Sequence, residues 1–532
     1  MSAAGRGRPG AVALIALLAG VAFVALYDAS LAHSRYPYSG DSASYIEMAA
    51  TLKADGRPRV TPWEIDPGGV DAVPQRLFPP GFAVVVAALI PLAGDARTAA
   101  TWPSRAAAAL LPLLVLVWWR GLAAPALLAL AGGWALVSPG VREWQYIAYS
   151  DVSALALAVA ALGLLARSLD EAGDGRPAWR WLLAGALAGL CYAVRNAGLA
   201  VLAAAAAAQG YAWLRGWLRP RAVALWSAGA LVPVAALEAY NLATFGSAWP
   251  YTMPPSVRGW LDNAGDLATA QLTDLGLPAA LVGAVPVPLL LAVLAAVFGA
   301  LAAAFLATRR ERASHLRLGL LLGYAGAGAL LLVASRSRFE WGNLIDSRNV
   351  LQYSFAFGLA LVVALGALAP RRGAAVAAAV LGLLVIAQAS AAVREALAAR
   401  SAPAETWLEL TRDQALMARV GAIGADTLVA SNAAVLFRIG ALRAARQLDV
   451  GGGDGDFAGS LALLAAAAGK RPSTFILVCN EWTWRFAACG AAPGPPSPAC
   501  VAVRLAAPRV AECAPARPAR GPGADVAAPE PD

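Results

Sequence analysis

Asp41, near the start of the chain, has the surroundings of a catalytic carboxylate. It follows a glycine and begins a stretch in which apolar residues recur at helical spacing, namely Tyr45, Met48 and Leu52. At about 100° per residue, Asp41 falls within about 40° of this apolar stripe, whereas Glu47 points away from it. We therefore expect an amphipathic helix over 41–54 at the membrane interface, with Asp41 as its N-cap and directed along the apolar side.

The chemistry open to Asp41 follows from its place at a helix start. The positive end of the helix dipole stabilises an ionised carboxylate there. Such a carboxylate can accept a proton from an incoming hydroxyl group or orient that group. The alternative is an ordinary N-cap, a role that Asp often supplies.

Most of the elements that position Asp41 are expected to span a membrane. Of 532 residues, 59% are hydrophobic and 14% are charged, and mean hydropathy is +0.60, whereas a soluble chain is about a quarter charged. Apolar blocks approach the roughly 20 residues that a spanning helix needs: Ala11–Tyr27, Val152–Leu165, Trp181–Val194, Leu199–Leu214, Val223–Tyr240, Ala279–Ala307, Leu316–Ala334, Leu351–Ala369 and Ala374–Ala392. With the apolar stretch 78–137, we expect 11 to 13 helices. No small-residue cleavage site precedes Tyr27, so we favour a retained helix over the alternative of a cleaved signal peptide.

Positive charge in the short loops predicts the orientation. The net charge of +9 is concentrated in loops between spans, which indicates cytoplasmic loops and no nucleic-acid partner: Arg215–Arg221, Arg309–Arg317 and Arg371–Arg372. Four longer segments then face outward: Asp28–Leu77, Gly140–Ser150, Phe245–Gly276 and Ser335–Asn349. Three spans within 78–137 would put the second of these segments in the cytoplasm. A re-entrant piece or one fused span in 78–137 would restore the orientation.

A second domain is expected after Ser401, where charged residues return. Helical and β-rich runs alternate there, which predicts a small α/β domain over 401–514. Its four cysteines suit disulfides in an oxidising compartment, with three pairings open and a zinc site or free thiols as alternatives: Cys479, Cys489, Cys500 and Cys513. The Pro- and Ala-rich tail 515–532 is expected to be disordered.

Short polar motifs follow Asp41 at the ends of the spans. In order, they are Arg76–Gly81 (RLFPPG), Ser138–Gly140 (SPG), Ser150–Asp151 (SD), Tyr192–Asn196 (YAVRN), Tyr240–Trp249 (YNLATFGSAW) and Asp346–Asn349 (DSRN). This succession resembles the GT-C glycosyltransferases, specifically the branch of the protein O-mannosyltransferases and the lipid A aminoarabinose transferase. The resemblance covers about residues 10–395. The C-terminal domain is similar to the outer domain that many of these proteins carry.

The resemblance implies an all-α polytopic membrane enzyme over residues 1–395. Such an enzyme moves a sugar, a hexose or a pentose, from a polyprenyl-phosphate donor to a lipid, glycan or protein acceptor. The carboxylate of the first outer loop, Asp41, is then catalytic, and Asp151 matches a second acidic position. Basic residues hold the donor phosphate through charge-assisted hydrogen bonds, with Arg195 and Arg348 as leading candidates. Further candidates for substrate contact are Arg76, Arg336, Arg338, Tyr45 and Asn241.

The chain departs from the family pattern at three places. Asp41 stands alone where many members have two adjacent acids, so a two-acid metal site is not predicted and a divalent cation is left open. Phe78 stands where some members have a basic residue before the double proline. The late motif continues as Asn349-Val350-Leu351 instead of an aromatic residue and prolines. We therefore expect a different substrate pocket or other arginines on the phosphate. A phosphate acceptor, as in some members, would need no general base.

Plainer roles are open for the same residues, and other functions for the whole chain. Asp151 would also serve as a helix cap, and the arginines as interfacial anchors. A transporter or flippase of lipid-linked sugar would carry ionisable residues in mid-span, whereas the acids here lie at span ends. A non-catalytic membrane scaffold predicts that Asp41→Asn has no effect. The expected location is the bacterial inner membrane, with the active site and the C-terminal domain on the periplasmic side.

Overall fold

The computed structural model describes most of the chain. The described residues are 9–63, 72–120, 124–170, 177–250, 253–339, 344–368, 372–424, 426–441, 444–447, 460, 462–464, 466–467, 473–479, 500–505 and 512–514. Cys489 and the tail 515–532, for which a disulfide and disorder were expected, lie outside them.

Contacts divide the chain into two units. One, here called the membrane unit, comprises Met1–Arg59 and Pro74–Pro403. The other, the α/β unit, comprises Val60–Val73 and Ala404–Asp532. The sequence-based division placed the whole first loop, 28–77, with the membrane domain. Its middle part instead belongs with the C-terminal unit, because its contacts are made there.

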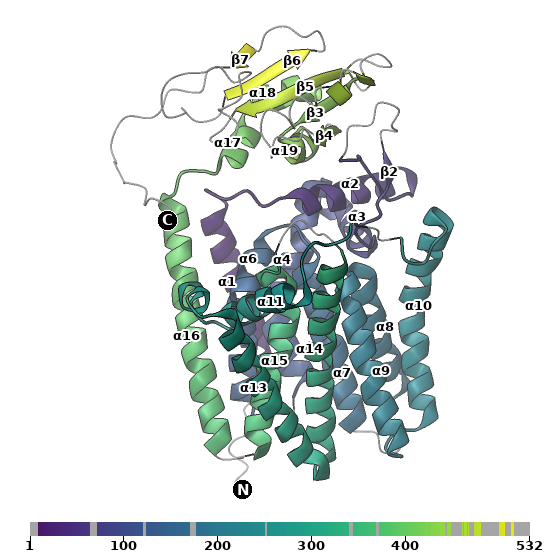
Figure 1. Cartoon of the computed structure of the whole chain (residues 1–532), viewed down its shortest axis with the longest axis vertical. Helices are drawn as coiled ribbons and strands as arrows, with labels where there is room; N and C mark the ends of the chain where they lie inside the picture. Colours follow the sequence, from purple (N-terminus) through teal and green to yellow (C-terminus); the bar gives the residue numbers. More distant parts are fainter. Residues whose placement is uncertain are drawn as a thin grey trace. The chain divides into compact units, whose positions relative to one another are not determined.

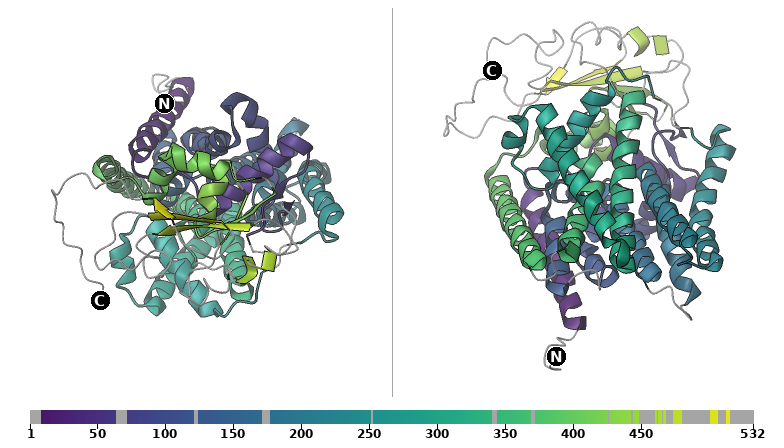
Figure 2. Two further views of the ribbon diagram at one scale, coloured as in Figure 1. Left: turned by 90° about the horizontal axis from the view of Figure 1, so that it is seen from above. Right: turned by 60° about the horizontal axis from the view of Figure 1, so that its bottom comes forward.

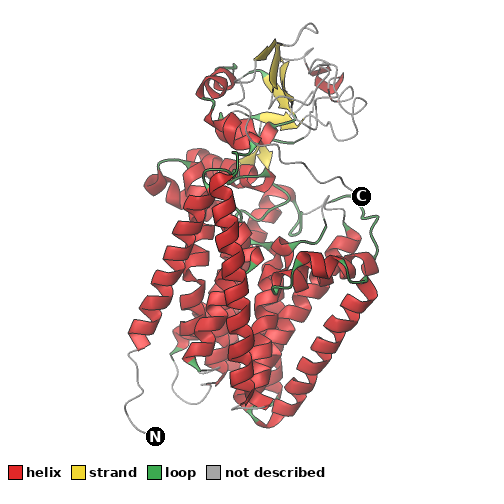
Figure 3. Ribbon diagram, turned by 90° about the vertical axis from the view of Figure 1, so that its left-hand side faces the viewer, coloured by secondary structure: helices red, strands yellow, loops and turns green. Residues whose placement is uncertain are grey.

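The membrane unit is a bundle of helices that run side by side (Figures 1 and 3). In the described residues, nine helices are long and apolar enough to cross a membrane: α1 (Pro9–Leu31), α4 (Ala96–Trp118), α7 (Asp151–Asp170), α9 (Leu199–Leu214), α10 (Pro220–Phe245), α13 (Val287–Ala307), α14 (Arg312–Arg338), α15 (Ser347–Leu368) and α16 (Arg372–Ser401). Three shorter apolar helices are α3 (Gly81–Ala93), α5 (Pro125–Val137) and α8 (Ala178–Val194). The predicted polytopic all-α fold is confirmed.

Shorter helices connect these spans. They are α2 (Gly40–Asp55), α6 (Pro139–Tyr146), α11 (Trp260–Asp274) and α12 (Ala279–Gly283), with short 3₁₀ turns at Asn196–Gly198 and Thr308–Arg310. The apolar block Ala279–Ala307 was expected as one helix but forms two, α12 and α13. Pro286 stands just before α13, where a residue without a backbone N–H starts a helix but does not continue one.

The basic loops gather at one end of the bundle. There Arg317 of α14 donates to Asp170 at the end of α7 (2.7 Å, Nε to Oδ2). Arg312 donates to the carbonyl of Trp217, in the loop after α9 (2.8 Å). We call this the basic end. The opposite end holds the start of α2 and is called the Asp41 end.

The short helix α3 explains why the segment 140–150 lies at the Asp41 end of the bundle. Gly81, its first residue, packs against the backbone of Ala193, near the end of α8. At the other end of α3 the chain enters α4, where Arg105 pairs with Asp28 of α1 (2.7 Å) at the Asp41 end. Thus α3 starts and ends at the Asp41 end, and its 13 residues do not cross the bundle. It is the non-crossing piece expected within 78–137, and 140–150 therefore returns to the Asp41 end.

The α/β unit is built on a five-stranded sheet. Its order is β4-β3-β5-β6-β7, with bounds Ala445–Gln447, Leu428–Ser431, Ser473–Cys479, Cys500–Leu505 and Glu512–Ala514. The pairs of β3 with β4 and with β5 are parallel, and the other two pairs are antiparallel. The helices α17 (Thr406–Arg412), α18 (Gln414–Gly421) and α19 (Ala434–Gly440) complete the described part. A two-stranded ribbon, β1 (Arg59–Val60) with β2 (Val73–Pro74), frames the middle of the first loop. The strands are drawn in yellow in Figure 3.

Two contacts hold the middle of the first loop within the α/β unit. The guanidinium of Arg438, on α19, lies over the ring of Trp63 at 4.3 Å. Arg446, a buried residue of β4, donates to the carbonyl of Pro62 (2.9 Å). In the same unit, the register of β5 and β6 sets the backbone of Cys479 opposite that of Cys500. The disulfides expected among the cysteines remain a prediction.

Candidate functional site

Two acids and two arginines from four parts of the membrane unit form one ion-paired cluster. Arg348 pairs with Asp41 and, through Nε, with Oδ2 of Asp151 at 3.2 Å. Arg195 pairs with the same Asp151 at 2.7 Å, from Nη2 to Oδ1. These are the two acids expected to be catalytic and the two arginines expected to hold the phosphate. The structure brings all four together.

Asp151 is the centre of the cluster. It is the first residue of α7, where the helix dipole favours a negative charge, and its side chain is fully buried. The preceding residue, Ser150, accepts from Arg195 (3.3 Å) and exchanges a hydrogen bond with the hydroxyl of Tyr45 (2.9 Å). A buried carboxylate is tolerated because two guanidinium groups neutralise it.

Asp41 reaches the cluster from the first turn of α2. The helix starts at Gly40 and its N-cap is Ser39, so Asp41 is not the cap that the sequence suggested. The cap role falls to Ser39, whose backbone N–H donates to Oγ of Ser42 (3.1 Å). The side chain of Asp41 is thereby left to pair with Arg348. Its own side chain is 22% exposed.

The apolar stripe of α2 faces protein, which differs from the expected contact with the membrane interface. Tyr45 and Met48 are each 1% exposed. The ring of Tyr45 lies 5.4 Å from that of Phe78 and 4.8 Å from that of Phe82, the second residue of α3. Because α3 stays at the Asp41 end, it offers α2 an apolar surface. Tyr45 therefore orders the cluster through Ser150.

Arg348 rests on a pair of aromatic rings that the sequence did not single out. Its guanidinium carbon lies 4.2 Å from the ring centre of Tyr149 and 5.6 Å from that of Trp144. These two rings stack at 5.3 Å with an angle of 14°. Trp144 also donates from its indole N–H to Oγ of Ser347 (3.0 Å). The only signal in the sequence was that both aromatic residues stand in the outward segment 140–150.

Other predicted substrate-binding residues lie outside the cluster. Arg336 is buried and donates to Oδ1 of Asn349, next to Arg348 in sequence (3.0 Å). Arg338 and Arg76 are exposed, and they lie over the rings of Phe339 and Phe245. Asn241 is buried and donates to the carbonyl of Ala248 (2.9 Å), within the loop after α10. Its amide closes that loop.

A metal ion bound at the cluster would need the carboxylates of Asp41 and Asp151 as ligands. Both of these carboxylates face guanidinium groups, and a metal ion would have to displace them. No group of three His, Cys, Asp or Glu side chains that could hold a metal ion occurs among the described residues.

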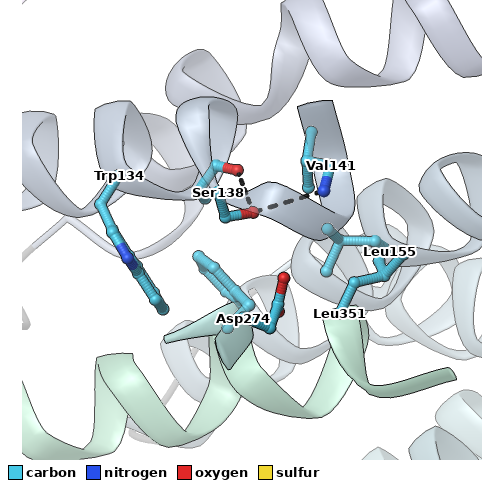
Figure 4. A pocket seen from close by; sticks show the side chains of 8 residues that line it. Trp134, Ser138, Val141, Leu155, Asp274 and Leu351 are labelled. Carbon is cyan, nitrogen blue, oxygen red and sulfur yellow. Dashed lines mark hydrogen bonds between the residues drawn. The ribbon is translucent and has the colours of Figure 1, made fainter. Parts of the chain in front are cut away.

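A second buried acid contacts α6, the helix that carries Trp144. Asp274, at the end of α11, is 1% exposed and accepts from the backbone N–H of Gly140, in α6 (2.8 Å). It faces a small pocket with Trp134 and Leu351 (Figure 4). A Cβ on Gly140 would lie 2.6 Å from Oδ1 of Asp274, so only glycine fits there. Burial raises the pKa of Asp274 to about 6.

Comparison with solved structures decides the fold. The chain is similar to ArnT from Cupriavidus metallidurans bound to undecaprenyl phosphate, with a TM-score of 0.53 and 11% identity over 88% of this chain and 93% of that one. It is also similar to the oligosaccharyltransferase from Archaeoglobus fulgidus in the apo form, with a TM-score of 0.56 and 14% identity over 90% of this chain and 70% of that one. This chain has the GT-C fold.

The GT-C fold agrees with the family resemblance seen in the order of the motifs. Another structure of the Archaeoglobus fulgidus protein, named AglB, holds an inhibitory peptide and a dolichol-phosphate, and matches at a TM-score of 0.53 and 12% identity over 90% of this chain and 70% of that one. No protein-family model and no curated protein matches this sequence. In the GT-C fold of this chain, the charged cluster lies at the Asp41 end, on the starts of α2, α7 and α15 and the end of α8. Figure 2 shows the bundle from above and from a tilted side.

Proposed function

We propose that this chain is a membrane glycosyltransferase that moves a sugar from a polyprenyl-phosphate donor to a hydroxyl group. The observation that carries the proposal is the pairing of Arg348 with Asp41 beside Asp151 and Arg195. Such a site places a proton acceptor next to the cations that a phosphate leaving group requires. The similarity to proteins that bind undecaprenyl phosphate and dolichol-phosphate supports the same donor class.

The reaction divides the roles among the four side chains. The acceptor hydroxyl oxygen forms a bond to C1 of the sugar, and its proton passes to the carboxylate of Asp41. The bond between C1 and the phosphate oxygen breaks, and its electron pair stays on the phosphate. Arg348 and Arg195 stabilise the phosphate, since guanidinium groups match its oxygens with paired hydrogen bonds. Asp151 holds both arginines in position.

The side of the membrane follows from loop charge. The basic loops lie at the end of the bundle opposite the cluster. Since basic loops stay in the cytoplasm, the cluster faces outward. This supports an active site on the periplasmic side of a bacterial inner membrane. For the acceptor, we propose the classes that the family resemblance implies, namely a lipid, a glycan or a protein.

The test is transfer of radiolabelled sugar from polyprenyl phosphate by the purified full chain. Lipid, glycan and peptide acceptors are supplied in parallel. Wild type is compared with Asp41→Asn and Arg348→Gln, and with Asp266→Asn as a matched control. Asp266 of α11 pairs at 2.6 Å with Arg258, which precedes that helix, so the control also removes one acid from an arginine pair.

We expect transfer by wild type and by the control, and a loss of at least about a hundredfold in the two cluster variants. This is the usual size of a general-base contribution for Asp41 and of electrostatic stabilisation of the leaving group for Arg348. Undiminished transfer by Asp41→Asn would contradict the assigned role of that residue. If no donor supports transfer by wild type, the protein is a scaffold or a transporter, and uptake of a lipid-linked sugar into vesicles separates these two.

A further inference from the structure

The charged cluster contains no spare positive charge for an incoming phosphate. Arg195 and Arg348 already have carboxylate partners in Asp151 and Asp41. The two acids and two arginines sum to zero, and their side chains are between 0% and 22% exposed. A phosphate that enters this partly desolvated site can bind Arg348 fully only if a carboxylate gives way.

The two carboxylates differ in how firmly they are held. Asp151 is fully buried, pairs with both arginines and lies at the start of α7. Asp41 is the more exposed of the two, and its ion pair among the described residues is with Arg348. Release of Asp151 would leave a buried charge without a partner, which costs several kcal/mol. Asp41 can turn toward solvent at much lower cost.

We infer that the donor phosphate binds by exchange, taking the place of Asp41 on Arg348 and thereby freeing the carboxylate that accepts the proton. The inference rests on the proposed function and adds an order of events to it. While Asp41 is paired with the guanidinium, its carboxylate is occupied by Arg348 and is not available to the acceptor hydroxyl. Donor binding therefore releases the carboxylate of Asp41 before the acceptor hydroxyl loses its proton.

Arg348 stays in place during the exchange because other groups hold it. Its guanidinium lies over Tyr149 and Trp144, and the hydrogen bond from its Nε to Asp151 is independent of Asp41. The hydroxyl of Tyr149 in turn is hydrogen-bonded to Ser39, the N-cap of α2. The rings of Tyr149 and Trp144 and the carboxylate of Asp151 therefore hold Arg348 in position. Asp41 and the phosphate then compete for the remaining side of its guanidinium.

The experiment measures binding of undecaprenyl phosphate, without a sugar, to the purified full chain in detergent. Asp41→Asn removes the competing charge, so this variant should bind the lipid phosphate at least about threefold more tightly than wild type, although its sugar transfer is at least about a hundredfold lower. Asp41→Ala is the second variant, and its elution on size exclusion is compared with that of wild type. The control Asp266→Asn should bind as wild type does.

A double-mutant comparison separates exchange from a general change of charge. When Arg348 is already replaced by Gln, adding Asp41→Asn should not increase the affinity for undecaprenyl phosphate. The guanidinium for which Asp41 and the phosphate compete is then absent. Equal tightening with and without Arg348 would overturn the exchange, as would unchanged or weaker binding by both Asp41 variants in the wild-type background. These outcomes leave the proposed function standing. Absence of lipid-phosphate binding by wild type would overturn both.

Discussion

Arg348 lies in the first turn of α15 and donates from Nε to Asp151, the first residue of α7, at 3.2 Å. An arginine at a helix start is disfavoured, because the helix dipole places positive charge there as well. The carboxylates of Asp151 and Asp41 offset this cost. An arginine at this position, in contact with two acids, fits the proposed role of Arg348 in binding the donor phosphate.

Loss of Asp151 should damage stability as well as activity. Asp151→Asn leaves two partly buried guanidinium groups with one fewer negative charge, and we expect a loss of about 3 kcal/mol or more in the free energy of unfolding. Thermal unfolding in detergent, followed with sugar transfer, measures both effects. Asp151→Glu keeps the charge and should recover part of the stability. Equal unfolding temperatures for Asp151→Asn and wild type would show that the pairs contribute little.

Trp144 should position Arg348 without contacting the sugar. Trp144→Leu removes the more distant of the two rings under Arg348, at 5.6 Å against 4.2 Å for Tyr149, and a cation–π contact contributes about 0.5–2 kcal/mol. We expect kcat to fall roughly two- to thirtyfold, with the affinity for undecaprenyl phosphate reduced by a similar factor. Trp144→Phe keeps a ring but loses the hydrogen bond to Ser347. Its kcat and phosphate affinity should lie between those of wild type and Trp144→Leu. A Trp144→Leu variant with normal kinetics and phosphate affinity would exclude the role.

The pH dependence of stability should report Asp274. Burial raises the pKa of its carboxyl from 3.8 to about 6, so the folded state binds the proton more tightly than the unfolded state. Stability is then greatest below about pH 4, falls as the pH rises from about 4 to about 6, and is constant above that. Over this range the contribution of Asp274 to the free energy of unfolding falls by at most about 3 kcal/mol.

Asp274→Asn provides the matched comparison. Its side-chain oxygen can still accept from the N–H of Gly140, but it does not titrate. We expect the unfolding temperature of this variant to change less between pH 4 and pH 6 than that of wild type. Parallel curves for the two proteins would contradict the raised pKa.

The middle of the first loop should depend on Trp63 for its place in the α/β unit. Trp63→Ala removes the ring beneath Arg438 and should cost about 2–4 kcal/mol of local stability. Limited proteolysis of the full chain measures this, with faster cleavage near residues 60–63 expected in the variant. Trp260→Ala, at the start of α11, changes an exposed tryptophan of the membrane unit and serves as the control. Unchanged cleavage in Trp63→Ala would show that Arg446 and Pro62 suffice.

Local patterns in the sequence determined a large part of this protein. Hydrophobic blocks predicted the spans, and the charge of the short loops predicted that Arg215–Arg221 and Arg309–Arg317 share one end. Both properties are set by neighbouring residues and by the membrane, so they need no knowledge of contacts. The order of the motifs also pointed to Asp41, Asp151, Arg195 and Arg348, because polar residues at span ends are not required for insertion.

Only the tertiary structure decided which of these residues meet and what surrounds them. The ion pair of Asp41 and Arg348 joins positions 307 residues apart, and no local periodicity encodes a contact of that range. The same holds for three other contacts: the rings of Trp144 and Tyr149 with Arg348, the packing of α3 on Tyr45, and the hydrogen bond by which Asn241 closes its own loop. Asp41 looked like an N-cap and is instead one partner of a partly buried arginine, because Ser39 caps the helix and packing brings α15 to its side.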